Sequence, residues 1–317
     1  MNRRRFTQQL AGTVLASCSF AGSVVLNRPA SPDSGKIPAE STFKMSVMLW
    51  TVFRDLPFDQ RLEKIAEAGY RNVQLVGEYE KWTSADFDRT NAKRRELGIT
   101  FDCTAGLKYG VSDPDQLELL LADLRRTLPI MERIGCPAII LLSGNRVPGI
   151  SRDMQHRSCV ETLRAAAGVV QGRSINGEPV RLLLETIDPE ENPQYFLTQV
   201  AEALEVVQEV NHPQVRLLYD VYHEQIAAGN LIKKLEKCLP YLALVHVADV
   251  PGRHEPGTGE IHYENIFRRL AELNYQGGVA MEFYPTGDPV TQLRAARELA
   301  LQCARNARRI DPPSRGV

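Results

Sequence analysis

Leu182-Leu-Leu-Glu185 is a short apolar run that ends in a carboxylate, and three later segments repeat this arrangement. They are Arg216-Leu-Leu-Tyr-Asp220, Leu244-Val-His246 and Val279-Ala-Met-Glu282. Each segment has the character of a β-strand that ends in a metal-capable side chain, and the four end residues are 35, 26 and 36 positions apart. That spacing fits a strand, a loop, a helix and a loop. Because the C-terminal ends of all strands of a (β/α)₈ barrel meet at one mouth, the pattern predicts such a barrel with these side chains at its mouth.

Predicted strands and helices alternate from residue 43 to residue 308. Strands are predicted at residues 44–50, 71–76, 99–103, 138–142, 180–185, 215–219, 242–247 and 278–283. Several of them are nearly continuous Val, Ile and Leu, as parallel strands covered on both faces should be. Helices are predicted at residues 59–68, 84–97, 115–134, 153–171, 192–210, 230–239, 263–273 and 289–308. Eight such units predict one α/β domain, a TIM barrel. An open doubly wound sheet is the alternative, but no Gly-x-Gly-x-x-Gly follows an early strand.

The first 26 residues are predicted to lie outside the barrel. Asn2-Arg-Arg-Arg-Phe6 resembles a twin-arginine export signal, and a weakly apolar stretch follows it. This order predicts an exported protein, and a disordered basic N-terminus is the alternative. Leu15-Ala-Ser-Cys18 also fits a lipoprotein signal, which would put a lipid anchor on Cys18 and hold the protein at the membrane rather than free in the periplasm. Residues 27–42 are predicted to be a linker and residues 309–317 a C-terminal tail.

Composition narrows the class of protein. The 317 residues carry a formal net charge of -1, and this near-neutral balance argues against an electrostatic nucleic-acid binder. No apolar run is long enough for an internal transmembrane helix of about 20 residues. The six cysteines are scattered and no Cys-x-x-Cys is present. Without Cys18 their number is odd, so we expect small buried apolar residues rather than a disulfide framework.

The four strand-end residues each have an ordinary explanation as well as a functional one. Glu185 and Asp220 are also typical helix-capping residues, and a lone His in a strand, such as His246, is more often a core residue. Glu282 closes the last strand. The same structural position on four successive strands favours a shared site. Carboxylate oxygens with one imidazole suit a single divalent ion such as Mg²⁺, Mn²⁺ or Co²⁺.

Two longer segments carry a specific resemblance. Tyr219-Asp-Val-Tyr-His-Glu-Gln225, followed by Gly229-Asn-Leu231, and Val250-Pro-Gly-Arg-His-Glu-Pro-Gly-Thr-Gly-Glu-Ile261 resemble segments of the xylose isomerase-like barrel superfamily and, within it, of the hydroxypyruvate isomerase family. The resemblance covers residues 43 to about 305. It implies that Glu185, Asp220, His246 and Glu282 bind one divalent metal ion and that the two Glu are catalytic and move the proton. It also implies that His223 and Arg253 contact substrate oxygens.

Two positions depart from the hydroxypyruvate isomerase pattern. Those isomerases usually carry Gln where this chain has His246, and they tend to have Glu at the position of Gln74. His at this position resembles instead the ketose 3-epimerases of the same superfamily. Trp50, Glu78 and His254 are further candidates for the substrate pocket, with ordinary core or surface roles as the alternative.

The residues together predict a metal-dependent isomerase or epimerase of a small sugar or hydroxy acid such as hydroxypyruvate. Removing a proton next to a carbonyl leaves an enediolate, whose charge a cation can stabilise, and two carboxylates can take and return the proton. The alternatives are another sugar-active enzyme on this barrel (an oxidoreductase or a lyase), an abasic-site endonuclease, and a non-catalytic sugar-binding barrel. Six histidines are few for a several-metal endonuclease, and the Glu pair argues against pure binding. The substrate, the metal and a homo-oligomeric state stay open.

Overall fold

The computed structural model describes residues 43–310, which contain a closed barrel of eight parallel strands. The strands follow one another around the barrel in the order β1-β10-β9-β8-β7-β4-β3-β2. Their bounds are β1 (Lys44–Met48), β2 (Asn72–Val76), β3 (Thr100–Ala105), β4 (Ala138–Leu142), β7 (Arg181–Glu185), β8 (Val215–Asp220), β9 (Leu242–Val247) and β10 (Gly278–Met281). The predicted TIM barrel is thereby confirmed. The predicted export signal, linker and residues 311–317 lie outside the described residues.

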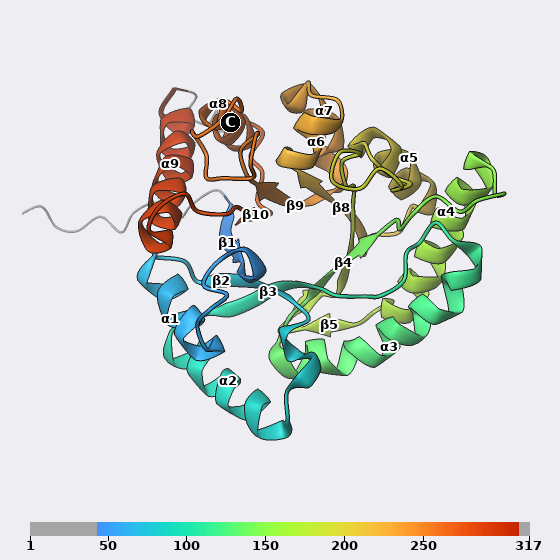
Figure 1. Cartoon of the computed structure of the whole chain (residues 1–317), viewed down its shortest axis with the longest axis horizontal. Coiled ribbons are helices and arrows are strands. Elements are labelled where there is room, and N and C mark those ends of the chain that lie inside the picture. Colours follow the sequence, from blue (N-terminus) through green and yellow to red (C-terminus); the bar gives the residue numbers. More distant parts are fainter. Residues whose placement is uncertain (1–42, 311–317) are drawn as a thin grey trace, which may run out of the picture. The chain divides into compact units, whose positions relative to one another are not determined.

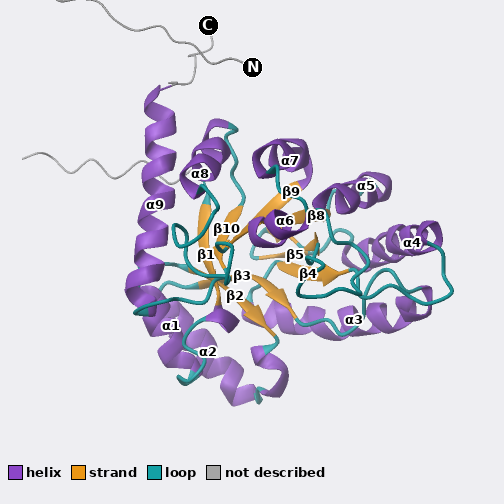
Figure 2. Ribbon diagram, turned by 45° about the horizontal axis from the view of Figure 1, so that its top comes forward, coloured by secondary structure: helices purple, strands orange, loops and turns teal. Residues whose placement is uncertain are grey.

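The helices form a ring outside the strands (Figures 1 and 2). They are α1 (Phe58–Glu67), α2 (Ser84–Glu96), α3 (Leu117–Ile134), α4 (Arg152–Val170), α5 (Val200–Val210), α6 (Val221–Ala227), α7 (Leu231–Cys238), α8 (Tyr263–Glu272) and α9 (Pro289–Ile310), with short 3-10 helices η1 (Leu49–Thr51), η2 (Glu78–Lys81), η3 (Pro114–Gln116) and η4 (Leu239–Tyr241). Between residues 43 and 310, none of the helices has the length and apolar character needed to cross a membrane.

The barrel interior places the candidate residues. An apolar cluster inside the strands includes Leu183, Leu218, Leu244 and Ala280. Successive side chains of a strand point to opposite faces, so the residue two positions later points inward as well. Two positions after these four apolar residues come Glu185, Asp220, His246 and Glu282. The strands thus carry a closed apolar layer with a polar layer directly above it at the C-terminal end.

One predicted helix begins later than expected, and two short elements lie between the predicted strands and helices. The helix predicted at 192–210 begins only at Val200, because the preceding loop pairs with the loop after β4: Arg146 N donates to Gln194 O and Phe196 N to Gly144 O. Between α4 and β7, residues 174–179 form a small hairpin, β5 (Ser174–Ile175) with β6 (Glu178–Pro179). The short helix α6 directly follows β8, as a capping role for Asp220 requires.

The cysteine prediction is confirmed for the described residues. All five are free thiols, and four of them are buried, as expected of small apolar residues (Cys103, Cys136, Cys159, Cys238 and Cys303). The C-terminal helix α9 runs to Ile310, slightly beyond the predicted barrel boundary at residue 308.

Candidate active site

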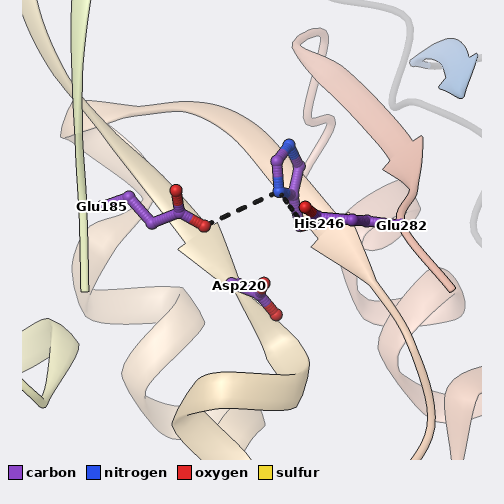
Figure 3. Close-up of side chains that lie close together, drawn as sticks. All are labelled: Glu185, Asp220, His246 and Glu282. Atoms are coloured by element: carbon purple, nitrogen blue, oxygen red, sulfur yellow. Dashed lines mark ion pairs between the residues drawn. The ribbon is translucent and has the colours of Figure 1, made fainter. Parts of the chain in front are cut away.

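The four strand-end residues lie around one point at the barrel mouth, as the sequence predicts. Glu185, Asp220, His246 and Glu282 each offer one ligand atom, and these atoms all lie within 4.8 Å of one another. All four residues are buried. Figure 3 shows the carboxylates of Glu185 and Glu282 turned toward the ring of His246. Their convergence is observed, whereas their roles as ligands and catalysts stay predictions at this point.

His246 is oriented by a residue of β2. Its Nε2 lies 2.8 Å from Gln74 Oε1, and both side chains are fully buried. An amide oxygen can only accept, so this bond places a proton on Nε2, and Nδ1 is the ring nitrogen that faces the carboxylates. Nδ1 lies 2.6 Å from Glu282 Oε2 and 3.7 Å from Glu185 Oε1. The first of these contacts is not aligned as a hydrogen bond, so Nδ1 and Glu282 Oε2 are buried atoms without a hydrogen-bond partner in the described part of the chain.

Glu282 and Glu185 have opposite electrostatic environments. Trp50 Nε1 donates to Glu282 Oε1 at 2.7 Å, and Arg253 Nη2 lies 3.0 Å from Oε2. Burial raises the pKa of Glu282, but His246 and Arg253 outweigh burial and hold that pKa far below its ordinary range. Burial raises the pKa of Glu185 to about 7, although His246 opposes the shift. The pair therefore combines one carboxylate that stays ionised with one that titrates near neutral pH.

Arg253 is a buried cation at the mouth. Its Nη2 lies 3.3 Å from Asp220 Oδ2 in addition to its contact with Glu282. Its guanidinium carbon lies 4.8 Å from the ring centre of Tyr222 and 5.8 Å from that of Trp50, within cation–π range. Burial lowers the pKa of Arg253, but the two carboxylates outweigh it, so the side chain stays charged.

His223 is held by an acid that sequence analysis missed. Its Nδ1 lies 2.6 Å from Asp188 Oδ2, while its Nε2 faces Arg253 Nη1 at 3.3 Å and Asp220 Oδ2 at 3.6 Å. Burial lowers the pKa of His223, but Asp220 and the bond to Asp188 outweigh it and raise the pKa to about 9. The only sequence signal for Asp188 is its place three residues after Glu185, in the loop that leaves β7.

Asp220 fulfils both of the roles that sequence left open. Its Oδ1 accepts from the backbone N–H groups of Tyr222 and His223, so it is the N-cap of α6. Its Oδ2 points to the four-residue cluster and to Arg253. The capping bonds fix the side chain, which makes Oδ2 a preorganised acceptor at the mouth.

The segment 250–261 forms a loop folded around one carboxylate. Asp249 Oδ1 accepts from the backbone N–H groups of Val250 and Ile261, and Oδ2 accepts from those of Gly257 and Gly259, at 2.9–3.0 Å. Asp249 is fully buried. The loop is therefore a fixed structure, and it carries Arg253 to the mouth. Asp249 was not among the predicted site residues.

The remaining predicted residues are placed differently from one another. Trp50 lies at the cluster through its bond to Glu282. His254 Nδ1 lies 2.7 Å from the carbonyl oxygen of Tyr284, which follows β10. Glu78 accepts from the backbone N–H of Val76 and faces Arg61 at 3.8 Å. Among the described residues, no contact joins Glu78 to the four-residue cluster.

Comparison with known proteins agrees with this geometry. A family model described as xylose isomerase-like TIM barrel matches residues 62–303. The chain is 30% identical to a 2-oxo-tetronate isomerase of Pectobacterium atrosepticum, over 77% of this chain and 93% of that protein. It is 28% identical to the hydroxypyruvate isomerase of Escherichia coli, over 76% and 93% respectively. A solved structure described as AP endonuclease, family 2, from Brucella melitensis matches with a TM-score of 0.71 and 26% identity, over 79% of this chain and 96% of that chain.

Proposed function

The chain belongs to the xylose isomerase-like TIM barrel family, and from this membership we propose that it is a divalent-metal-dependent isomerase or epimerase of a small sugar or hydroxy acid such as hydroxypyruvate. The isomerase class rests on the relatives. The observation that carries the mechanism is the pair of buried carboxylates, Glu185 and Glu282, which both face His246 Nδ1 beside a buried Arg253.

The residues at the mouth fit a divalent cation. Three carboxylates and one imidazole nitrogen are the donor set that suits Mg²⁺, Mn²⁺ or Co²⁺. Among the described residues, His246 Nδ1 and Glu282 Oε2 are buried atoms that have no hydrogen-bond partner, and a shared cation would coordinate both of them. We therefore assign Glu185, Asp220, His246 and Glu282 as ligands of one ion. Bound there, the ion would supply charge stabilisation for an enediolate.

The proton transfer falls to the two glutamates. Isomerisation requires removal of a proton from the carbon next to the carbonyl and its return to the neighbouring carbon. Glu185, whose pKa is raised to about 7, is suited to take and return a proton near neutral pH. Glu282 is kept ionised by His246 and Arg253, so it is in the form that can accept a proton, and its low pKa makes it the weaker base of the pair.

His223 and Arg253 are the groups that would hold substrate oxygens. Both are buried, both face the mouth, and each is fixed by a carboxylate partner, Asp188 for His223 and Asp220 for Arg253. Two positioned cationic donors can orient the hydroxyl and carbonyl oxygens of an enediol-forming substrate. Trp50 would serve indirectly by fixing Glu282.

A second candidate within this class is a ketose 3-epimerase. An epimerase needs an acid and a base on opposite faces of one carbon, whereas an aldose–ketose isomerisation needs only one carboxylate for the proton. The presence of two buried glutamates facing one imidazole favours this candidate as well. Which substrate carbon exchanges its proton distinguishes the two.

The test is a substrate screen in D₂O with the Mn²⁺- or Mg²⁺-loaded protein, followed by NMR. Hydroxypyruvate, 2-oxo-tetronate and neutral ketoses are the substrates. Deuterium at the carbon next to the carbonyl, together with an aldehyde–ketone change, identifies an isomerase, and deuterium with inverted configuration identifies an epimerase. Absence of both from every substrate, with metal bound, would contradict the proposal.

We also propose that the protein is exported in folded form through the twin-arginine route, on the basis of Asn2-Arg-Arg-Arg-Phe6. Lipidation of Cys18 would leave the exported form at the membrane.

A further inference from the structure

A cavity of about 410 Å³ is lined by the loops that follow β3, β4 and β7. Its walls include Lys108, Ser112, Asn145, Arg146 and Tyr195, and we refer to it as the side cavity. Each of these loops leaves the C-terminal end of its strand, so the side cavity lies at the end of the barrel that carries the four-residue cluster. Its volume falls in the range of roughly 300–1,000 Å³ typical of small-molecule sites.

The side cavity lies beside the end of β7, the strand that carries Glu185. In the barrel register Glu185 pairs with Leu142, and the next residue, Ser143, already lines the cavity. The loop after β7 forms a wall of both sites. Its Asp188 binds His223, and its Tyr195 forms a backbone bridge with Asn145, another lining residue of the side cavity.

The side cavity carries two cations that are not neutralised by ion pairs. Within the described part of the chain, neither Lys108 nor Arg146 forms a salt bridge, and the Arg146 side chain donates only to the carbonyl oxygen of Pro193. The lining also contains one acid, Asp113, whose oxygens accept from Asp115 N and from the amide of Gln116. The balance of the lining is therefore positive, and its acid is already engaged.

The shape of the cavity is built into the backbone. Gly110 and Gly144 line it and lie against each other, and a Cβ on Gly110 would come within 2.4 Å of the carbonyl oxygen of Ser143. The two loops can approach this closely only without side chains there. Backbone bonds from Val111 N to Leu142 O and from Ser112 N to Ser143 O hold them in place. The cavity is thus a preformed feature of fixed loops.

We propose that the side cavity binds the anionic end, a carboxylate or a phosphate, of an acyclic substrate whose reacting carbons lie at the four-residue cluster. Lys108 and Arg146 would pair with the anion, and Ser112 and Asn145 would supply further polar contacts. This proposal rests on the proposed function and deepens it, because it makes the substrate an acid or a phosphate ester rather than a neutral sugar.

The experiment compares substrates that differ only in the anionic group. Hydroxypyruvate and dihydroxyacetone phosphate are each paired with dihydroxyacetone, and 2-oxo-tetronate is paired with erythrulose. In the Lys108→Met, Arg146→Met double variant, kcat/KM for the anionic member should fall by about 10- to 100-fold, as expected for lost charged hydrogen bonds. The neutral member should change less than about twofold. A loss confined to the two keto acids identifies a carboxylate, and a loss confined to the phosphate identifies a phosphate.

Two further variants separate charge from structure. Lys108→Met alone removes a side chain for which the structure gives no bond, and Arg146→Lys keeps the charge while releasing Pro193. The first should show part of the selective loss and the second little of it. The control is a second double variant, Lys237→Met with Arg95→Met, whose residues lie in the exposed last turns of α7 and α2. It makes the same change in net charge away from the mouth and should leave kcat/KM unchanged for all substrates. An equal loss for anionic and neutral substrates, or no loss for either, would overturn the proposal.

A binding measurement keeps this proposal distinct from the proposed function. Calorimetric titration of the metal-loaded protein with tartronate and with inorganic phosphate needs no turnover. One outcome is that the double variant weakens anion binding at least about tenfold although the wild-type protein turns over no substrate. That result would support the anion site and contradict the isomerase function. The opposite outcome is that the wild-type protein turns over substrates and the double variant leaves anion binding unchanged. That result would support the isomerase function and contradict the anion site.

Discussion

Gln74→Leu should weaken metal binding although Gln74 contacts no proposed substrate group. Gln74 Oε1 accepts from His246 Nε2 at 2.8 Å, and both side chains are fully buried inside the barrel. Leucine is similar in size to glutamine but offers no acceptor. The variant leaves a buried N–H unpaired, which costs about 1–3 kcal/mol, and it releases the imidazole to adopt the other tautomer, with its proton on the nitrogen that faces the carboxylates. Loss of such a partner typically lowers metal affinity by about 10- to 100-fold.

The assay is calorimetric titration of Mn²⁺ into metal-free protein, with the His246 tautomer followed by long-range ¹H–¹⁵N NMR. Gln74→Glu is the matched control, because it keeps an oxygen acceptor at the same place. It should bind Mn²⁺ more tightly than Gln74→Leu does. A folded Gln74→Leu protein with Mn²⁺ affinity within about twofold of the wild type would refute the role given to this bond.

Three other predictions concern the active site, the barrel interior and the export signal. Glu282→Gln should lower kcat by about 10²–10⁴-fold with the barrel intact by circular dichroism, and His223→Ala should lower it less. Near-wild-type turnover by Glu282→Gln would contradict the proton-transfer role given to Glu282. Burial raises the pKa of Asp102 to about 6, although Ser46 donates a hydrogen bond to it. The stability that protonated Asp102 contributes is therefore present below its unfolded pKa of about 3.9 and is lost as pH rises through 6. At about 1.36 kcal/mol per pKa unit, Asp102→Asn should gain about 3 kcal/mol over the wild type at pH 8 and little at pH 4, and denaturant titrations with the same gain at both pH values would contradict this. Lys at both Arg3 and Arg4 should retain the protein in the cytoplasm in a fractionation assay, and unchanged export would remove the twin-arginine hypothesis.

The barrel and its ligand layer could be predicted because both follow from local periodicity. Leu183 and Glu185, or Leu244 and His246, are two positions apart on one strand, so the inward direction of the second follows from that of the first. Parallel strands then bring all such ends to one mouth without further information. The start of α5 could not be predicted in this way, since residues 194–197 are held by bonds to the loop after β4 rather than by their own propensity.

The residues that orient the site could not be found from the same signals. Gln74 and His246 are 172 positions apart, and nothing in either strand indicates that their side chains meet. Asp188 lies in a loop, where an acid is ordinary, and its role depends on His223 of α6. Glu78, a candidate for the substrate pocket, accepts a hydrogen bond from the backbone N–H of the nearby Val76, a local bond typical of acids in turns.

The structure of loop 250–261 explains why its unusual sequence was a useful indicator of the family. Asp249 needs four backbone N–H groups within reach, and two of them belong to glycines. At Gly259 a Cβ would lie 2.0 Å from the carbonyl oxygen of Val250, so no other residue fits that position without a shift of the backbone. Arg253 has a φ of 57°, a left-handed conformation that costs a non-glycine residue roughly 1–2 kcal/mol. Its contacts with Asp220, Glu282 and the two aromatic rings offset that cost, so the glycines and the acid of this loop act together to fix one guanidinium at the mouth.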